Sequence, residues 1–375
     1  MAAAERKTAT PPLPPGSTIG MLGGGQLGRM AALAAAQLGY RVHVFCPEAD
    51  APATQVTPLH TRAAYTDEAA LAAFADAVDV ITYEFENVPA AAADFLAARK
   101  PVRPGPNVLR ICQNRLREKD FLRSVGVPTT RFAEVTGIEA LTRVARDLGR
   151  PCVLKTAEMG YDGKGQVLIR TSTDLAEAWA EMTGGQKGPG QNGVQGIVEA
   201  FVDFRLEMSV IVARGLDGGI QTWVPVENQH SNHILDQTIV PARISEKASQ
   251  KAEAIARHTA EEIGLVGVLA IEMFLTAEDE ILVNELAPRP HNSGHWTIDA
   301  SVTSQFEQQV RAVCGLPLGS TDRLCDAVMK NLLGDDVERW RGILSDPTVK
   351  LHLYGKTEAR PGRKMGHYTK LITRP

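Results

Sequence analysis

The chain has 375 residues, of which 44% are hydrophobic and 22% charged, a composition typical of a soluble globular protein with two or three domains. The net charge of −4 gives no support to a nucleic-acid partner, and no apolar run is long enough to cross a membrane. Five widely spaced cysteines without a C-x-x-C pair indicate a reduced cytoplasmic protein and argue against a disulfide frame or zinc site.

The first elements predict a doubly wound, Rossmann-like unit. Residues 1–16 are rich in proline and are expected to form a flexible tail, not a signal peptide. An apolar strand over 17–22 leads into glycines 23, 25 and 28, a helix to about Leu38 and a second strand over Arg41–Phe45. This order matches the G-x-G-x-x-G pattern of nucleotide-binding folds.

The glycine motif alone leaves the ligand open. Backbone amides at such a helix start favour phosphate or carboxylate groups. A nicotinamide site needs an acidic residue at the end of the second strand, but Cys46-Pro47 stands there and Glu48 comes late. The motif is therefore compatible with a dinucleotide, with another ligand, or with tight packing only.

A third strand is predicted over Val78–Thr82, after a helix over Asp67–Ala77. Glu84 and Glu86 follow this strand at its carboxyl end, the edge where open α/β sheets bind ligands, although solvated loop charges are the alternative. Pro104-Gly105-Pro106 breaks the chain, and one basic helix is expected from Val108 to Val125. A domain boundary is expected near residues 104–120.

The middle of the chain predicts a hairpin that closes over phosphates. Strands over Cys152–Thr156 and Val167–Arg170 flank a loop with three glycines and a lysine, and Lys155 lies on the first strand. The alternative is an ordinary hairpin, because Asp-Gly is a common turn pair. Amides and ammonium groups in such a loop can hold phosphates, but this is not a Walker loop. The glycine-rich segment 184–196 is expected to be a mobile surface loop.

Further strands carry two isolated glutamates. Glu199 lies in the strand 197–202 and Glu207 in the strand 206–212, where they could accept from an adenine amine and a ribose hydroxyl. Surface glutamates on strands do neither by default. Strands are also expected over 221–225 and 239–244, with Asn228-Gln229-His230 between them, and a helix over 249–264.

The stretch from Val268 to Trp296 is the most informative. Apolar runs over 268–275 and 281–286 flank an acidic turn, which predicts a β-hairpin. If Thr276 lies opposite Ile281, Glu272 faces Glu285, with Cβ atoms roughly 4.5 to 5.5 Å apart. Two facing carboxylates are destabilising without a positive group between them, and oxygen ligands suit magnesium. The alternative is a shifted register in which one glutamate points to solvent.

The rest of the chain adds proton-transfer and anion-binding groups. Residues 288–295 are dense in them, a helix is expected over 301–313, and strands over 327–333 and 350–354. The basic tail with Lys356, Arg363 and Lys364 either binds a phosphate or forms a solvated face.

Taken together, these stretches resemble the ATP-grasp superfamily, and within it the family of 5-(carboxyamino)imidazole ribonucleotide synthetases of purine (IMP) biosynthesis. The resemblance runs from about Thr18 to His367. It rests on LGGGQLGRM at 22–30, TYEFENV at 82–88, GYDGKGQ at 160–166, NELAPRPHNSGHWT at 284–297 and RPGRKMGH at 360–367. The superfamily alone would leave biotin carboxylase or a formate-dependent transformylase open, but the last two stretches are similar to the synthetases.

The resemblance implies an ATP-dependent C–N ligase that carboxylates the amine of aminoimidazole ribonucleotide with bicarbonate, through carboxyphosphate, and releases ADP and phosphate. It implies ATP, Mg²⁺ (two ions with nucleotide bound), bicarbonate, no NAD, and a cytoplasmic homodimer without nucleic-acid or membrane partners. The implied domains are an N-terminal doubly wound domain at 17–112, an ATP-grasp domain at 113–312 with subdomains 113–197 and 198–312, and a small β-rich C-terminal domain at 313–375.

The resemblance also implies roles for individual residues. The metal ligands would be Glu272 and Glu285, and the catalytic residues Tyr161, Asp162, Lys164, Arg289 and His291. ATP would contact Arg115, Lys155, Gly160, Tyr161, Asp162, Gly163, Lys164, Gly165, Gln166, Glu199, Ala200, Phe201, Val202, Glu207, His230, Asn284 and Glu285. The ribonucleotide would contact Gly25, Gln26, Leu27, Glu86, Tyr161, Asp162, Arg289, His291, Lys356, Arg363 and Lys364. Ala287 departs from the asparagine that many ATP-grasp enzymes carry two residues after the second metal glutamate.

Two other classes of protein compete with the ligase. A nicotinamide oxidoreductase would explain the glycine motif but leaves the paired glutamates and the basic tail without a role. A catalytically silent nucleotide-binding protein would be expected to have lost the metal carboxylates. Another ATP-grasp ligase or transformylase remains the nearest alternative within the superfamily.

Overall fold

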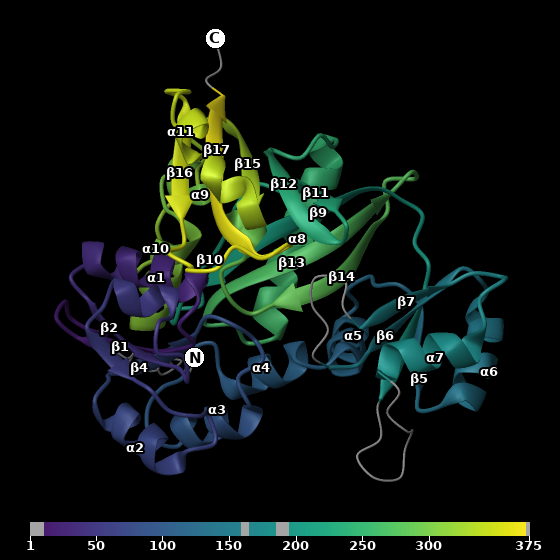
Figure 1. Ribbon diagram of the computed structural model, residues 1–375, viewed down its shortest axis with the longest axis horizontal. Coiled ribbons are helices and arrows are strands. Elements are labelled where there is room, and N and C mark those ends of the chain that lie inside the picture. The colour runs from purple at the N-terminus through teal and green to yellow at the C-terminus, as the bar shows by residue number, and fades with distance from the viewer. Residues whose placement is uncertain (1–10, 159–164, 185–194, 373–375) are drawn as a thin grey trace, which may run out of the picture.

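The computed structural model describes residues 11–158, 165–184 and 195–372 (Figure 1). The N-terminal part is a parallel sheet in the order β3-β2-β1-β4, as predicted for a doubly wound domain. Side chains alternate along β1, so Met21 packs under α1 and α10 while Leu22 packs under α2 and α3. The bounds are β1 Thr18–Leu22, α1 Gln26–Gln37, β2 Arg41–Phe45, the short 3₁₀ helix η1 Pro52–Gln55, β3 Leu59–Thr61, α2 Glu68–Asp76, β4 Val80–Tyr83 and α3 Ala90–Ala97.

The linker helix is broken in two. The prediction of one helix from Val108 to Val125 is wrong, because α4 (Pro106–Cys112) ends before α5 (Arg115–Ser124) begins. Asn114 between them has an extended backbone, and its side chain accepts from the amides of Leu116 and Arg117 as an N-cap. This cap places Arg115 at the first position of a new helix.

A small antiparallel sheet follows in the order β5-β8-β6-β7. The predicted hairpin of β6 and β7 is confirmed, with Lys155 opposite Gln166. Helices α6 and α7 cover this sheet and share its apolar core. The bounds are β5 Phe132–Val135, α6 Ile138–Leu148, β6 Cys152–Thr156, β7 Gln166–Ile169, α7 Leu175–Thr183 and β8 Gly196–Ala200.

A large sheet forms the rest of the molecule, in the order β14-β13-β9-β11-β12-β15-β17-β16, with β10 beside β9. Helix α8 packs on one face with α4 and α5, whereas Trp223 and Trp296 fill the core on the opposite face. The bounds here are β9 Phe204–Arg214, β10 Ile220–Thr222, β11 Val226–Ser231, β12 Ile234–Val240, α8 Glu246–Glu262, β13 Gly267–Thr276, β14 Ile281–Ala287, η2 Asn292–Gly294, α9 Thr297–Ala300 and α10 Gln305–Cys314. Predicted helix 301–313 begins only at Gln305, because Ser304 caps it.

Two predictions for the centre of this sheet are wrong. The segment 228–230 is not a connection but lies within β11, and the turn to β12 comes later, at Asn232-His233, where both residues have positive φ. The second strand spans 234–240 and not 239–244, since Pro241 cannot donate to the ladder. The displaced turn places Asn228 in the sheet beside Glu207.

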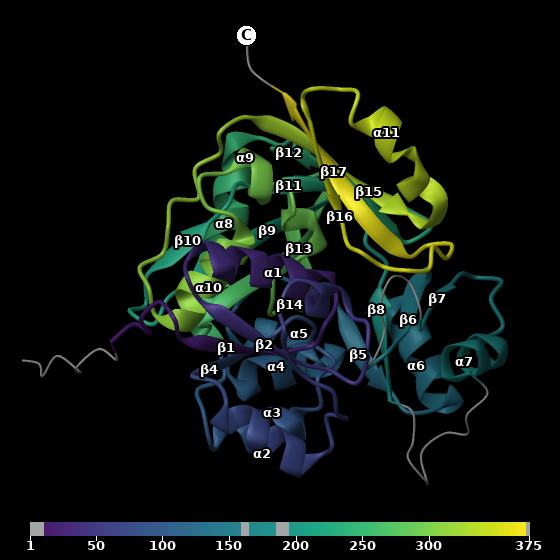
Figure 2. The ribbon, with the colours of Figure 1, turned by 60° about the vertical axis from the view of Figure 1, so that its left-hand side comes forward.

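The C-terminal strands extend the large sheet. Strand β12 pairs with β15, and β17 lies between β15 and β16, as Figure 2 shows at the yellow end of the chain. Strand β17 was not predicted, because the sequence indicated only a basic cluster where this strand begins. The bounds are β15 Asp326–Leu333, η3 Gly334–Arg339, α11 Trp340–Ile343, β16 Val349–Leu353 and β17 Lys364–Ile372. Among the described residues, no helix is long and apolar enough to span a membrane.

Candidate active site

Glu272 and Glu285 face each other on β13 and β14, as predicted. The register at the turn differs from the expected one, because Ile281 pairs with Leu275 and not with Thr276. A β-bulge at Asn284 shifts the pairing by one residue and restores the opposition of the two glutamates. The prediction was therefore right about the carboxylates and wrong about the turn.

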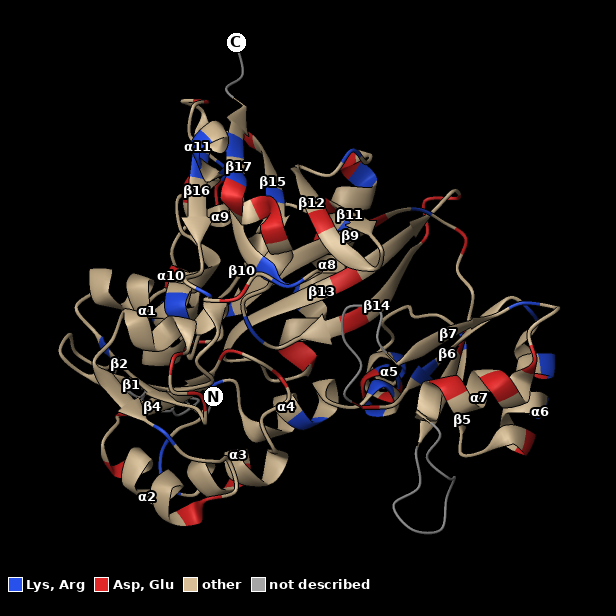
Figure 3. Cartoon of the chain, viewed as in Figure 1, with Lys and Arg blue, Asp and Glu red and all other residues tan. Residues whose placement is uncertain are grey.

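Each of the facing carboxylates has a nitrogen partner in this structure. The guanidinium of Arg115, which opens α5, lies 2.7 Å from Glu285, and Nε2 of His291 lies 3.1 Å from Glu272. Figure 3 shows acidic positions on β13 and β14 and basic positions on α5. Burial alone would raise the pKa of Glu285, but Arg115 outweighs it and holds that pKa at about 2. Both predicted metal ligands are thus placed next to a group that can neutralise them.

The donor set fits a hard divalent cation. Two opposed carboxylates supply oxygen ligands, and magnesium commonly takes one or two carboxylates, with water and substrate phosphates completing its shell. Within the described residues there is no cluster of three or more histidine, cysteine or acidic side chains that could hold a metal without such help. The buried Oδ1 of Asn284 lacks a hydrogen-bond partner there, which is typical of a site completed by a ligand.

Glu199 lies between two lysines. Its carboxylate accepts from Lys155 at 2.8 Å, and the ammonium of Lys119 lies 3.5 Å away. Burial would raise the pKa of Glu199, but the two lysines lower it to about 2. Lys155 and Glu199, predicted separately as ATP-binding residues, are therefore brought together on adjacent strands of the small sheet.

Lys119 is a candidate site residue that the sequence did not reveal. Its side chain is fully buried and donates to Thr129 at 3.1 Å and to the carbonyl of Asn284 at 3.0 Å. With Glu199, these contacts join α5, the small sheet and the bulge of β14. In the sequence Lys119 is one of several basic residues in a helix, and only its spacing from the buried Leu116 and Leu122 hinted that it faces inward.

The buried carboxyl group of Glu118 makes the stability of the fold depend on pH. Burial raises its pKa to about 8, although Lys119 opposes the shift. The pKa of a glutamate in the unfolded chain is about 4.3. Between about pH 4.3 and about pH 8 the folded protein therefore retains a proton that the unfolded chain has lost, and the free energy of unfolding decreases as pH rises through this range. We expect Glu118→Gln, which can still accept from the amide of Leu286, to raise the melting temperature by several degrees at pH 9 and by much less at pH 5. Thermal unfolding at both pH values measures this, and an equal gap at both would contradict it.

The two predicted ribose-side residues also meet. Glu207 on β9 and His230 on β11 form an ion pair, and Glu207 lies opposite Asn228 in the register. Burial would lower the pKa of His230, but the hydrogen bond with Glu207 raises it overall.

The amides of the glycine loop bind a side chain of the same protein, Glu84. The amides of Gly25 and Gly28 donate to the carboxylate of Glu84, the second at 2.8 Å. Burial raises the pKa of Glu84, while the amides and the positive charges of Arg289 and Lys356 act in the opposite direction. Glu84 is therefore not the solvated loop charge that the sequence left open. Its carboxylate occupies the anion-binding amides of the loop, and a dinucleotide would have to compete with it for them.

Glu86 belongs to the site as well. Arg289 donates to it through two nitrogens, the contact from Nη2 being 2.9 Å, so residues 203 positions apart form one partly buried pair. The pKa of Glu86 is lowered, because Arg289 outweighs the effect of burial. The basic tail contacts the N-terminal domain, since Gln55 bonds both Arg29 of α1 and the carbonyl of Gly355 next to Lys356.

Gly160, Tyr161, Asp162, Gly163 and Lys164 lie outside the described residues. Gly165 has a positive φ and packs on Thr156, and Phe201 is 46% exposed. Lys356 donates to the carbonyl of Lys364, and Arg363 donates to the carbonyl of Glu358.

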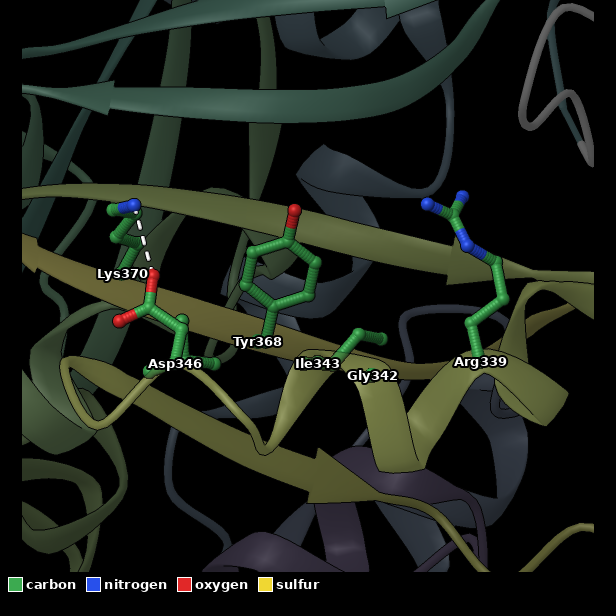
Figure 4. A pocket seen from close by; sticks show the side chains of 7 residues that line it. Arg339, Gly342, Ile343, Asp346, Tyr368 and Lys370 are labelled. Atoms are coloured by element: carbon green, nitrogen blue, oxygen red, sulfur yellow. Dashed lines mark hydrogen bonds and ion pairs between the residues drawn. The ribbon is translucent and has the colours of Figure 1, made fainter.

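An open hollow of about 580 Å³ lies between α11 and β17, away from these groups (Figure 4). Asp346 and Lys370 pair at one end of it at 2.9 Å, and Tyr368 stands between Lys370 and Arg339. None of the predicted site residues lines it.

Comparison with known proteins identifies the family. Family models match residues 17–113 as a ribonucleotide synthetase preATP-grasp domain, 120–306 as an ATP-grasp domain and 327–374 as a phosphoribosylaminoimidazole carboxylase C-terminal domain. The chain is 48% identical to the N5-carboxyaminoimidazole ribonucleotide synthase of Brucella melitensis, covering 96% of this chain and 98% of that protein. It is also 48% identical to a bifunctional purine synthesis protein of Dictyostelium discoideum, over 95% of this chain and 37% of that longer protein.

Solved structures show the same similarity. An N5-carboxyaminoimidazole ribonucleotide synthetase in complex with ADP superposes with a TM-score of 0.92 at 45% identity, covering 97% of this chain and 94% of that one. An Aspergillus clavatus synthase in complex with ADP and 5-aminoimidazole ribonucleotide superposes with a TM-score of 0.87 at 29% identity, covering 96% and 94%. Fold and facing carboxylates therefore define an ATP-grasp ligase. More narrowly, the chain belongs to the N5-carboxyaminoimidazole ribonucleotide synthase family.

Proposed function

We propose that this chain carboxylates the exocyclic amine of 5-aminoimidazole ribonucleotide, using ATP and bicarbonate, in purine biosynthesis. The observation that carries the proposal is the opposition of Glu272 and Glu285. Arg115 contacts Glu285, and Arg289 contacts Glu86 of the N-terminal domain. Phosphoryl transfer depends on charge neutralisation and in-line positioning more than on covalent chemistry, and such a group of charges supplies both.

The nucleotide is proposed to lie between the small and large sheets. Glu199 and Glu207 would contact its adenosine, and Arg115 and Lys155 its phosphates. The polar atoms that support this are the unpartnered Oδ1 of Asn284 and the paired Glu207 and His230, all on strands of the large sheet. Magnesium held by Glu272 and Glu285 would neutralise the charge of the transferred phosphoryl group.

The reaction balances without another reagent. An oxygen of bicarbonate attacks the γ-phosphorus of ATP, and ADP leaves, forming carboxyphosphate. The amine nitrogen then attacks its carboxyl carbon, the C–O bond to phosphate breaks, and the nitrogen loses a proton. Asp162, which lies outside the described residues, is the proposed acceptor for that proton, while His291 with its hydrogen on Nε2 would orient Glu272. Exclusion of water protects carboxyphosphate, and residues 160–166 are the proposed cover.

The ribonucleotide is proposed to bind where the N-terminal domain meets Arg289. Glu86 and Arg289 are paired there, and Lys356 is near enough to influence Glu84. The basic side chains of the tail would take the phosphate of the substrate, which is a group that lysine and arginine bind well.

Turnover assays test the proposed function directly. Purified protein with ATP, magnesium and bicarbonate is expected to release ADP slowly, and aminoimidazole ribonucleotide is expected to stimulate this release strongly. Carbon from labelled bicarbonate should appear in an acid-labile product. ADP release that ignores the ribonucleotide would keep the ligase class and point to another acceptor, which would overturn the substrate assignment.

Assembly, location and domain limits belong to the same proposal. Boundaries near residues 112 and 312, a homodimer and a cytoplasmic location follow from the resemblance to the family. Sedimentation of the purified protein at a mass of one chain, 40.4 kDa, would contradict the dimer.

A further inference from the structure

A chain of buried hydroxyl and amide groups leads from the centre of the large sheet to His291. Nδ1 of His291 contacts Oγ of Ser293 at 2.9 Å, and Oγ of Ser293 contacts Oγ of Ser209 at 2.7 Å. Asn228 continues the chain at 3.0 Å from Ser209, and Thr238 ends it at 3.1 Å from Asn228. The members beyond the histidine are all buried, and three of them, Ser293, Ser209 and Thr238, have no exposed surface.

The two ends of the imidazole determine where its hydrogen lies. The backbone N–H of Ser293 points to Nδ1 at 3.4 Å, and an amide can only donate. On the other side of the ring, Nε2 lies 3.1 Å from Glu272, and a carboxylate can only accept. A neutral His291 is therefore the tautomer with hydrogen on Nε2 and a lone pair on Nδ1.

The direction of the remaining bonds follows step by step. Ser293 uses its single hydrogen on Nδ1, so it accepts from Ser209. Ser209 in turn uses its hydrogen on Ser293, so it accepts from the amide nitrogen of Asn228. The carbonyl oxygen of Asn228 is then left to accept from Thr238. Each hydroxyl of the chain donates one hydrogen bond, and the direction is consistent from Thr238 to His291.

The backbone of the histidine is held separately. The side chain of Gln305, which has no exposed surface, accepts from the amide of His291 at 2.8 Å and donates to its carbonyl at 2.7 Å. Gly294 leaves room for this contact, because a Cβ there would lie 2.4 Å from Oε1 of Gln305. Gln305 fixes where the residue is, whereas the hydroxyl chain determines how its ring is turned.

We infer that Asn228, Ser209 and Ser293 are positioning residues for the carboxylation. They orient the His291 ring and keep its hydrogen on Nε2, toward Glu272. The expected change in activity rests on the proposed function, whereas the orientation and the tautomer of the ring do not depend on it. Partners that orient a metal-bound histidine through its other nitrogen typically change activity roughly 10- to 100-fold when they are removed, and we expect an effect of that size for His291.

Asn228→Asp is the sharpest test, because it replaces the donating amide by an acceptor of the same shape. Ser209 must then donate to residue 228 and accept from Ser293, which turns the Ser293 hydroxyl away from Nδ1. We expect the neutral ring to shift toward the Nδ1–H tautomer, and kcat for carboxylation to fall roughly 10- to 100-fold while KM for ATP stays unchanged. The ¹⁵N shifts of the imidazoles report the tautomer, with the resonances of His291 identified by their loss in His291→Gln.

Further variants keep the test decisive if that one folds poorly. Ser293→Ala should weaken the tautomer preference and lower kcat, whereas Ser293→Thr, which keeps the hydroxyl, should restore both. Thr259→Ala is the matched control, since it removes a buried hydroxyl that donates only to the carbonyl of Ile255 in α8. An unchanged tautomer in Asn228→Asp, or Ser293→Ala with the kinetics of the control, would overturn the inference. Wild-type protein without carboxylation would overturn the proposed function instead, and the imidazole spectra would still decide the positioning of the ring.

Discussion

Glu285→Gln is expected to reduce ribonucleotide-dependent ADP release by about a thousandfold. A metal-held phosphoryl group gains several kcal/mol of transition-state stabilisation, and about 4 kcal/mol corresponds to that factor in rate. Glutamine keeps the size of the side chain and an oxygen that Arg115 can approach, but it removes the negative charge that opposes Glu272. The measurement is steady-state ADP release at saturating ATP, with and without added magnesium.

The control for this variant lies in the same hairpin. Glu280→Gln removes an exposed carboxylate at the turn and is expected to leave turnover unchanged, since only the backbone of Glu280 takes part in the ladder. Normal ATP turnover by Glu285→Gln would remove the main support for a metal-dependent ligase. A loss of turnover that matched a loss of folded protein would be a stability effect, and thermal unfolding of both variants separates the two.

The hairpin shows how far sequence reasoning reaches in this protein. Two apolar runs and the acidic turn between them identified β13 and β14, and the spacing of the glutamates suggested that they face each other. The bulge at Asn284 was invisible, because nothing in a sequence of alternating residues marks where one residue is added to a ladder. The prediction of facing carboxylates is confirmed although its premise about Thr276 and Ile281 is wrong.

Long-range pairs were the part that could not be predicted. Glu86 and Arg289 were both selected as substrate-binding residues, but only the packing of the N-terminal domain against the large sheet reveals that they form one pair. Glu84 was left undecided, and the structure shows that it fills the amides of the glycine loop. Local pattern identifies the element on which a residue lies, whereas the partner of a buried charge depends on the tertiary fold.

Lys119 is the clearest case of such a buried charge. We expect Lys119→Met to lower the free energy of unfolding by about 3 kcal/mol. Methionine fills the space of the side chain but leaves Glu199 with one lysine, and leaves Thr129 and the Asn284 carbonyl without their donor. Removing one partner of a buried ion pair costs roughly 3 to 5 kcal/mol, and the lower end applies because Lys155 still contacts Glu199. Thermal and urea unfolding measure the loss, with Lys251→Met on the exposed side of α8 as the control.

A second substitution tests the cause of that loss. If Lys119 stabilises the fold by neutralising Glu199, then removing the charge of Glu199 should make the loss of the lysine less costly. Lys119→Met combined with Glu199→Gln is therefore expected to be more stable than the sum of the two single variants predicts. Additive effects would mean that Lys119 acts through Thr129 and the Asn284 carbonyl, and that the bulge of β14, not the carboxylate, is what this lysine holds. In either case a raised KM for ATP in Lys119→Met would place the lysine in the nucleotide site, because Glu199 and Asn284 are both proposed to contact ATP.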